Sequence, residues 1–123
     1  MPILDIEVVG QRPGDPPTEK LAERIANVVG TALAVPKGQL WVKVRKLSAS
    51  SYAENGPPSQ VLPVFVRVLV RTKDPSVWPK RAEQIAGAVS EATARDRASV
   101  HVIFEPDATE RVFFGGVPDP RRG

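Results

Sequence analysis

Two stretches of the chain, AERIANVVGTA at residues 22–32 and AEQIAGAVSEA at residues 82–92, decide its fold. They are offset by 60 residues and are identical at six of their eleven positions. In both, apolar residues recur at spacings of three and four, which indicates a helix with one buried face. The likeness predicts that the chain contains the same structural unit twice.

Short segments rich in β-forming residues flank both helices and are bounded by proline and glycine. The first helix should begin near Thr18, whose hydroxyl can cap free N–H groups, and should end before Pro36. The second should begin at Asp74 and Pro75, because proline is tolerated in the first helical turn. We expect strands at 2–9, 40–47, 63–71 and 98–105.

Each unit is predicted to be strand–helix–strand, so its two strands should be parallel with a right-handed crossover. Two such units form a four-stranded sheet with both helices on one face, which is an α+β fold. Pro2 matches Pro63 at an offset of 61, which places one extra residue in the loop after the first strand. We expect one domain over residues 1–123, made of repeat one at 2–56, repeat two at 63–116 and a C-terminal tail at 117–123.

The face of the sheet away from the helices has nothing in the sequence to cover it. The segment PVFVRVLVR at 63–71 is apolar enough to be a central strand. The uncovered face should therefore carry apolar residues such as Trp41 or Phe65. Because an exposed apolar patch usually marks an interface, we expect the chain to associate with itself.

The composition excludes several kinds of site. The chain has 123 residues, of which 41% are hydrophobic, so it can form the core of a soluble domain. The absence of cysteine excludes disulfides, thiolate zinc sites, iron–sulfur clusters and a cysteine nucleophile. The single histidine, His101, leaves no His-rich metal site, and no Walker or GxGxxG motif occurs. We therefore expect no metal ion and no cofactor.

The chain carries a small excess of positive charge. Lysine and arginine outnumber aspartate and glutamate by 17 to 14, which gives a net charge of +3. This small excess suits a site for small anions as well as a weak nucleic-acid face, but no RNA-binding aromatic motif accompanies it. No apolar run approaches the roughly 18 residues of a membrane helix, and Met1 is not followed by a basic, apolar leader. We expect a cytoplasmic protein with no nucleic-acid or membrane partner.

Pro2 is the first candidate for catalysis. Removal of Met1, which a small second residue permits, would turn the proline nitrogen into a secondary amine on a rigid ring. An α-amino group titrates near about 8, and nearby cations and an apolar pocket lower its pKa because both disfavour the charged form. Such a base can abstract a proton next to a carbonyl group. Alternatively, the proline simply starts an edge strand, where its missing N–H costs nothing.

Three segments of the chain together resemble the tautomerase superfamily, which includes 4-oxalocrotonate tautomerase, macrophage migration inhibitory factor and the 3-chloroacrylic acid dehalogenases. The segments are PILDIEVVGQR (2–12), GTALAVPKGQLWVKV (30–44) and ASVHVIFEPDATERVFFGG (98–116). The resemblance covers nearly the whole chain, as two fused copies of the short tautomerase unit. It implies the tautomerase/MIF-like fold, a homotrimer and catalysis by an amino-terminal proline.

The resemblance assigns roles to individual residues. Pro2 falls on the catalytic proline, and Arg12 on the arginine that holds a substrate carboxylate, a task that suits its planar guanidinium. Tyr52 falls on a phenylalanine that keeps the surroundings of the proline apolar. Trp41 and His101 fall where the short tautomerases place a second arginine, so the usual dicarboxylate reaction is in doubt. His101 also fits the simpler interpretation of a histidine in a sheet.

Two cations follow the third strand. Arg71 and Lys73 fall where the fused-unit dehalogenases and malonate semialdehyde decarboxylase bind the substrate carboxylate. They equally fit a cationic loop before a helix. The dehalogenases also need an acidic residue near the C-terminal end to activate water. Glu110 lies close to that region of the chain, but Phe113 and Phe114 occupy the positions nearest to where the acidic residue is expected.

The expected function is therefore that of a cofactor-independent tautomerase or isomerase. Its substrate is expected to be a small enolic or unsaturated carboxylate, with Pro2 as the general base. Dehalogenation or decarboxylation of a three-carbon acid, with protonated Pro2 as the acid, is the alternative within the superfamily. A binding or signalling protein that keeps the fold without the chemistry is the alternative outside catalysis.

Overall fold

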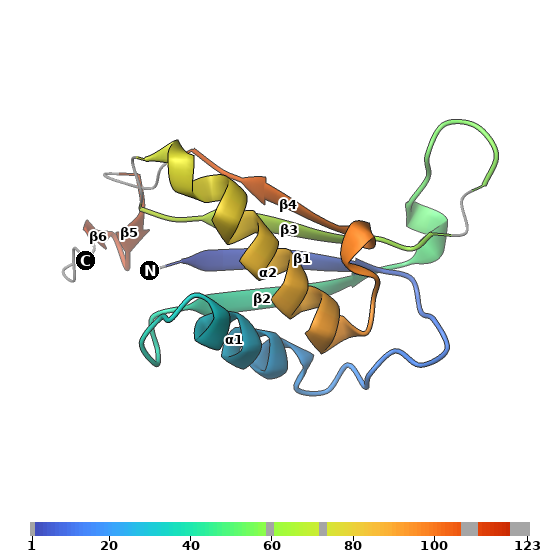
Figure 1. Cartoon of the computed structure of the whole chain (residues 1–123), viewed down its shortest axis with the longest axis horizontal. Helices are drawn as coiled ribbons and strands as arrows, with labels where there is room; N and C mark the ends of the chain where they lie inside the picture. Colours follow the sequence, from blue (N-terminus) through green and yellow to red (C-terminus); the bar gives the residue numbers. More distant parts are fainter. Residues whose placement is uncertain (1, 59–60, 72–73, 107–110, 119–123) are drawn as a thin grey trace.

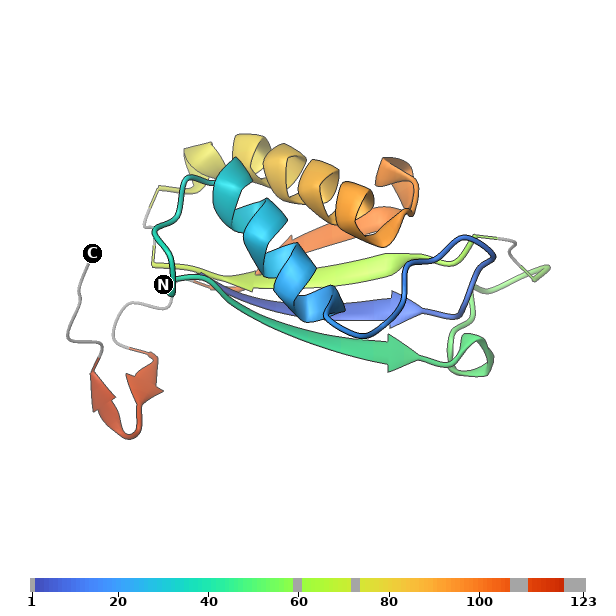
Figure 2. The same ribbon diagram turned by 90° about the horizontal axis from the view of Figure 1, so that it is seen from below.

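The chain forms a four-stranded sheet that is covered on one face by two helices (Figures 1 and 2). The computed structural model describes residues 2–58, 61–71, 74–106 and 111–118. This arrangement confirms the predicted α+β fold with both helices on one face. The strands of the sheet are β1 (Ile3–Val9), β2 (Trp41–Leu47), β3 (Val64–Leu69) and β4 (Val100–Phe104), and the helices are α1 (Leu21–Ala32) and α2 (Trp78–Thr93).

The strand order in the sheet is β2-β1-β3-β4. β1 pairs with β2 in parallel, and β3 pairs with β4 in parallel, with one helix between the strands of each pair. This confirms the predicted strand–helix–strand units. The two units meet where β1 and β3 pair in antiparallel, so the amino end of β1 lies beside the carboxyl end of β3. That antiparallel pairing determines which residues share an edge of the sheet.

The core lies between the sheet and the helices. Alternate residues of the central strands are fully buried on the helix side, because successive side chains of a strand point to opposite faces. The residues at three- and four-residue spacings on α1 and α2 pack against them, as the sequence periodicity predicted. The core members with no exposed surface are Leu4 and Ile6 on β1, Val64, Val66 and Val68 on β3, Ile25 and Val29 on α1, and Val89 on α2.

The predicted offset of 61 between the first strand and its copy is wrong. An odd offset matches Ile6, which is buried, with Arg67, which is exposed on the other face. In the structure Ile6 pairs with Val66, and both are buried. The residues buried on the helix side have even numbers in both strands, namely Leu4, Ile6 and Val8 on β1 and Val64, Val66 and Val68 on β3. An offset that matches buried with buried positions is therefore even. Pro63 is therefore not the structural counterpart of Pro2.

The two helices begin in different ways. The predicted cap at Thr18 is not formed: α1 begins at Leu21, whose N–H donates to the backbone carbonyl of Thr18 at 3.2 Å, with no side-chain cap. The predicted start of the second helix is confirmed in outline. Asp74 accepts a hydrogen bond from the Ser76 N–H at 3.0 Å, and a short 3-10 turn, η2 (Pro75–Val77), leads into α2.

The carboxyl-terminal segment contains a short hairpin where the sequence suggested only a tail. β5 (Phe113–Phe114) and β6 (Val117–Pro118) pair in antiparallel. Gly115 and Gly116 form the turn with φ of 64° and 83°, a left-handed conformation that glycine adopts without strain. The hairpin lies near the amino end of β1, away from the helices (Figure 2).

Two further 3-10 turns complete the described elements, η1 (Ala49–Ser51) and η3 (Arg97–Ser99). Within the described ranges, neither α1 nor α2 is long and apolar enough to cross a membrane.

Candidate active site

Pro2 lies at the amino end of a central strand, next to the carboxyl end of β3. It is buried, and its carbonyl accepts a hydrogen bond from the Trp41 N–H at 3.0 Å. Ile3 pairs with Leu69, so Arg71, two residues further along, is carried to the same edge of the sheet. The structure thus brings Pro2, Trp41 and Arg71 to one edge. We call this edge of the sheet the Pro2 edge.

Trp41 forms an aromatic wall at the Pro2 edge. Its indole Nε1 donates to the carbonyl of Gly38 at 3.1 Å, and its ring meets Phe114 of the hairpin edge to face, with centroids 5.1 Å apart. The side chain remains 41% exposed. An apolar ring therefore occupies the position where the resemblance placed a second arginine. The hydrogen bond to Gly38 and the contact with Phe114 of the hairpin hold this ring in place.

Arg12, Tyr52 and His101 lie at the other end of the sheet. Arg12 follows the carboxyl end of β1, and the six residue steps from Ile3 to Val9 span about 20 Å. The Arg12 N–H donates to the Asp15 carboxylate at 2.8 Å, and the residue is exposed. Within one chain, Arg12 therefore does not reach Pro2.

Tyr52 and His101 are joined through one aromatic ring. Phe65 lies 6.0 Å from the Tyr52 ring and 5.5 Å from the His101 ring, centroid to centroid. Phe65 pairs with Glu7, so this cluster sits toward the carboxyl end of β1. The Tyr52 hydroxyl donates to the Glu54 carboxylate, and this hydrogen bond raises the pKa of Tyr52. Tyr52 is thus a neutral phenol at physiological pH.

The face of the sheet away from the helices mixes rings with ion pairs. Asp5 lies 3.8 Å from the Lys43 ammonium and 3.7 Å from the Arg45 guanidinium, and Arg67 pairs with Glu105 at 3.0 Å. These pairs are largely exposed, so each adds little stability on its own. Ile103 is exposed among them, and Phe65 is half-buried. The uncovered face thus carries the apolar residues that the sequence predicted. It also carries charged pairs that the sequence did not predict.

A buried ion pair fixes the loop that carries Arg12. Arg95 contacts both carboxylate oxygens of Asp15, at 3.0 and 2.8 Å, and the side chains are 0% and 5% exposed. Its remaining N–H groups donate to the carbonyls of Val9, Gly10 and Leu62. The hydrogen bond from Arg95 is the main cause that lowers the pKa of Asp15, against the opposite effect of burial. We call this the Arg95–Asp15 clasp.

Trp78 holds a buried donor with no acceptor. Its ring stacks on Phe104, with centroids 5.1 Å apart and planes 3° from parallel. Its indole nitrogen is buried, and it finds no hydrogen-bond acceptor among the residues that the structure describes. An unsatisfied buried donor costs roughly 1–3 kcal/mol of folding free energy. The indole N–H of Trp78 therefore lowers the stability of the folded chain.

Two candidates lie outside the described residues, Lys73 and Glu110. Among the residues that the structure does describe, no group of three or more His, Cys, Asp or Glu side chains could hold a metal ion.

No protein-family model matches the sequence, and no curated protein matches it. Solved structures do match. A fused 4-OT, a wild-type symmetric trimer, has a TM-score of 0.71 at 14% identity, over 94% of this chain and 93% of that one. The macrophage migration inhibitory factor of Trichinella spiralis has a TM-score of 0.65 at 13% identity, over 94% and 97%. FG41 malonate semialdehyde decarboxylase, inhibited by 3-bromopropiolate, has a TM-score of 0.63 at 13% identity, over 91% and 88%.

These three proteins are all members of the tautomerase superfamily. At these identities the likeness concerns the fold. It confirms that the chain has the tautomerase/MIF-like fold that the three sequence segments suggested.

Proposed function

We propose that this protein is a cofactor-independent tautomerase or isomerase that acts on a small enolic or unsaturated carboxylate. Pro2, freed by removal of Met1, serves as the general base. The observation that carries the proposal is the placement of buried Pro2 at the end of a central strand, with Arg71 at the same edge. The fold, shared with a 4-OT, supports it.

The chemistry needs one proton and no co-reactant. The Pro2 amine accepts the proton of the enol hydroxyl, and the ammonium returns it to the carbon of the enol double bond, so that a ketone forms. Arg71 holds the carboxylate of the substrate and stabilises the negative charge that develops on the oxygen. A cation beside a buried amine also favours its neutral, basic form. Trp41 closes one side of this edge and limits the access of water.

The site is completed between chains in this proposal. Arg12 lies beyond the carboxyl end of β1, whose six residue steps span about 20 Å. Tyr52 and His101 lie at the level of Glu7, four residue steps from Ile3, or about 13 Å along the strand. One small substrate therefore does not touch Pro2 and these three residues within a single chain. We infer that a homotrimer places these three residues of one chain against the Pro2 edge of the next. The uncovered face of the sheet, with exposed Ile103, supports association.

A decarboxylase or dehalogenase of a three-carbon acid is the second candidate. Arg71 stands where that chemistry would bind the carboxylate, and malonate semialdehyde decarboxylase shares the fold. In this case protonated Pro2 would be the acid. A non-catalytic binding or signalling protein of the same fold is the third candidate, and it applies if Met1 is retained.

Mass spectrometry of the purified chain is the first measurement. A retained Met1 leaves Pro2 without a free amine and contradicts every enzymatic proposal. If Met1 is absent, we expect enol-to-keto conversion of phenylpyruvate or 2-hydroxymuconate to fall by at least about a hundredfold in Pro2→Ala, as loss of a general base implies. Activity that Pro2→Ala leaves unchanged would rule out Pro2 as the base. Halide release from 3-chloroacrylate would favour the second candidate.

Mixing two inactive variants tests the assembly. Pro2→Ala and Arg12→Ala chains are combined in equal amounts, unfolded and refolded together. If each site takes Pro2 from one chain and Arg12 from the next, half of the chains supply each residue, and about one quarter of the sites are intact. Recovery of about a quarter of the wild-type activity is expected. No recovery would show that Pro2 and Arg12 do not act across an interface.

A further inference from the structure

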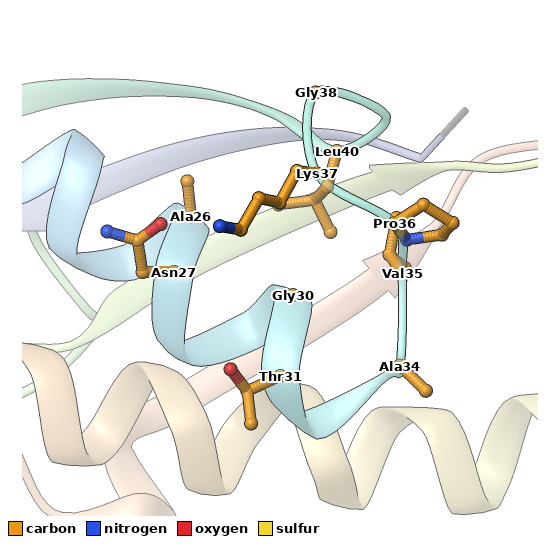
Figure 3. Close-up of a pocket in the computed structure, with 10 residues that line it drawn as sticks. All are labelled: Ala26, Asn27, Gly30, Thr31, Ala34, Val35, Pro36, Lys37, Gly38 and Leu40. Carbon is orange, nitrogen blue, oxygen red and sulfur yellow. The ribbon is translucent and has the colours of Figure 1, made fainter.

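A groove separate from the Pro2 edge opens beside α1. It lies between the carboxyl-terminal half of the helix and the loop that leads to β2 (Figure 3). Its volume is about 680 Å³, which falls within the size range of pockets that bind small molecules. Ala26, Ala34 and Leu40 supply apolar lining, and Pro2 is not part of it.

The polar groups of the groove converge on one region. The Lys37 side chain extends from the loop back over α1, with its ammonium on the side of Asn27 (Figure 3). Lys37 is the one charged residue in the lining, and Thr31 adds a hydroxyl. Within the described part of the chain, no carboxylate lies within 4.0 Å of the Lys37 ammonium. The ammonium is therefore available to an anion from solution.

The backbone keeps the groove open. A Cβ added at Gly30 would meet no atom within 4 Å, so the space above this turn of the helix is empty. The helix ends at Ala32, and Ala34, two residues later, has a left-handed φ of 54°. The Val35 N–H closes the end by donating to the Gly30 carbonyl at 2.9 Å. This ending turns the chain sharply and carries Lys37 back across the helix.

We propose that this groove binds a small monocarboxylate with a short apolar tail. The carboxylate would pair with the Lys37 ammonium and accept from the Asn27 amide, while the tail would lie against Ala26, Ala34 and Leu40. A carboxylate is favoured over a cation because the lining holds one positive charge and no negative one. The site is distinct from the proposed catalytic edge and does not depend on the catalytic proposal.

Trp41 provides a direct readout of the groove. Gly38, a lining residue, accepts the hydrogen bond from the Trp41 indole at 3.1 Å, and the Trp41 N–H donates to Pro2. A ligand that orders the loop will change the surroundings of the indole. In a Trp78→Phe background, Trp41 is the only tryptophan of the chain, so its fluorescence reports binding.

The experiment titrates this single-tryptophan protein with sodium hexanoate, hexan-1-ol and hexylammonium chloride. We expect saturable binding of hexanoate, about tenfold tighter than that of hexan-1-ol, because a charge-assisted hydrogen bond adds roughly one decade of affinity. Hexylammonium should bind more weakly than the alcohol. Equal binding of the three compounds, or no saturable change with hexanoate, would overturn the proposal.

Matched variants locate the binding. Lys37→Met should weaken hexanoate binding about tenfold, whereas Lys80→Met, an exposed lysine outside the groove, should not change it. Gly30→Leu should abolish binding by filling the groove, whereas Gly87→Leu, at a helical glycine with equally open space, should not. If Arg71→Met removes the binding and Lys37→Met does not, hexanoate occupies the Pro2 edge, and the groove proposal is refuted without affecting the catalytic one.

Discussion

Replacing Arg95 with methionine tests whether the Arg95–Asp15 clasp holds the two units together. The substitution keeps the apolar stem and removes hydrogen bonds to Asp15 and to three backbone carbonyls, with lengths from 2.8 to 3.1 Å. Both side chains are buried, so Asp15 is left without its main counter-charge. Breaking a buried ion pair from one side costs roughly 3–5 kcal/mol. We expect the free energy of unfolding to fall by about that amount.

Urea denaturation followed by circular dichroism at pH 7 measures this change. Arg97→Met is the matched control, because Arg97 is exposed and makes one long hydrogen bond, 3.4 Å, to the Glu83 carbonyl. We expect the control to change the free energy of unfolding by no more than about 0.5 kcal/mol. A loss below about 1 kcal/mol in Arg95→Met would refute the reasoning, because it would mean that the buried pair is not coupled to folding.

The same clasp predicts a pH dependence. The folded chain lowers the pKa of Asp15 from 3.8, mainly through the hydrogen bond from Arg95. Asp15 therefore binds its proton less tightly in the folded than in the unfolded chain. Its contribution is present above about pH 4 and is lost as the pH falls through the lowered folded pKa. The stability difference between wild type and Arg95→Met should shrink between pH 5 and pH 2, and a constant difference would contradict the assignment.

Three further predictions concern single side chains. Trp78→Phe removes the unpartnered indole N–H and keeps an aromatic ring against Phe104. Thermal unfolding should therefore show unchanged or higher stability. A loss of more than about 1 kcal/mol would mean that the donor is satisfied in the folded chain. Ala34→Gly relieves the left-handed φ of 54° and should raise the free energy of unfolding by about 0.5–1 kcal/mol in urea. Glu54→Gln removes the carboxylate that raises the pKa of Tyr52, so ultraviolet titration should show the phenol ionising at lower pH than in wild type. An unchanged titration would show that this hydrogen bond does not form in solution.

The sequence predicted the elements whose signal is local. The three- and four-residue spacing of apolar residues located both helices, and the β-rich segments located the strands that pair in parallel. The predicted offset of 61 between the first strand and its copy was wrong because it was based on the identity of Pro2 and Pro63. It did not take into account the alternation of buried and exposed residues along the strands. The alternation is the stronger constraint, since a shift by one residue moves every side chain to the other face.

Other features were missed although a signal was present. Phe-Phe-Gly-Gly-Val at 113–117 places two glycines between β-forming residues, which is a typical hairpin sequence. The Arg95–Asp15 clasp had no such signal. Its partners are 80 residues apart, and nothing near either residue shows that the end of α2 returns to the first loop. Long-range polar contacts of this kind depend on the packed arrangement of elements rather than on local sequence.

The candidate site shows the same division between local and long-range information. The residues that the resemblance assigned fall into two groups at opposite ends of β1, with Pro2, Trp41 and Arg71 at one end and Arg12 at the other. A sequence motif places these residues along the chain but does not state which end of the sheet each one occupies. The antiparallel pairing of β1 with β3 brings Arg71 to Pro2, and no pairing within the chain brings Arg12 there. The proposed role of Arg12 therefore depends on the association of chains, whereas the proposed roles of Pro2 and Arg71 do not. Trp41 meets Phe114 at the edge where a second cation was expected. In our proposal, Arg71 within the chain and Arg12 of a neighbouring chain therefore recognise the charge of the substrate.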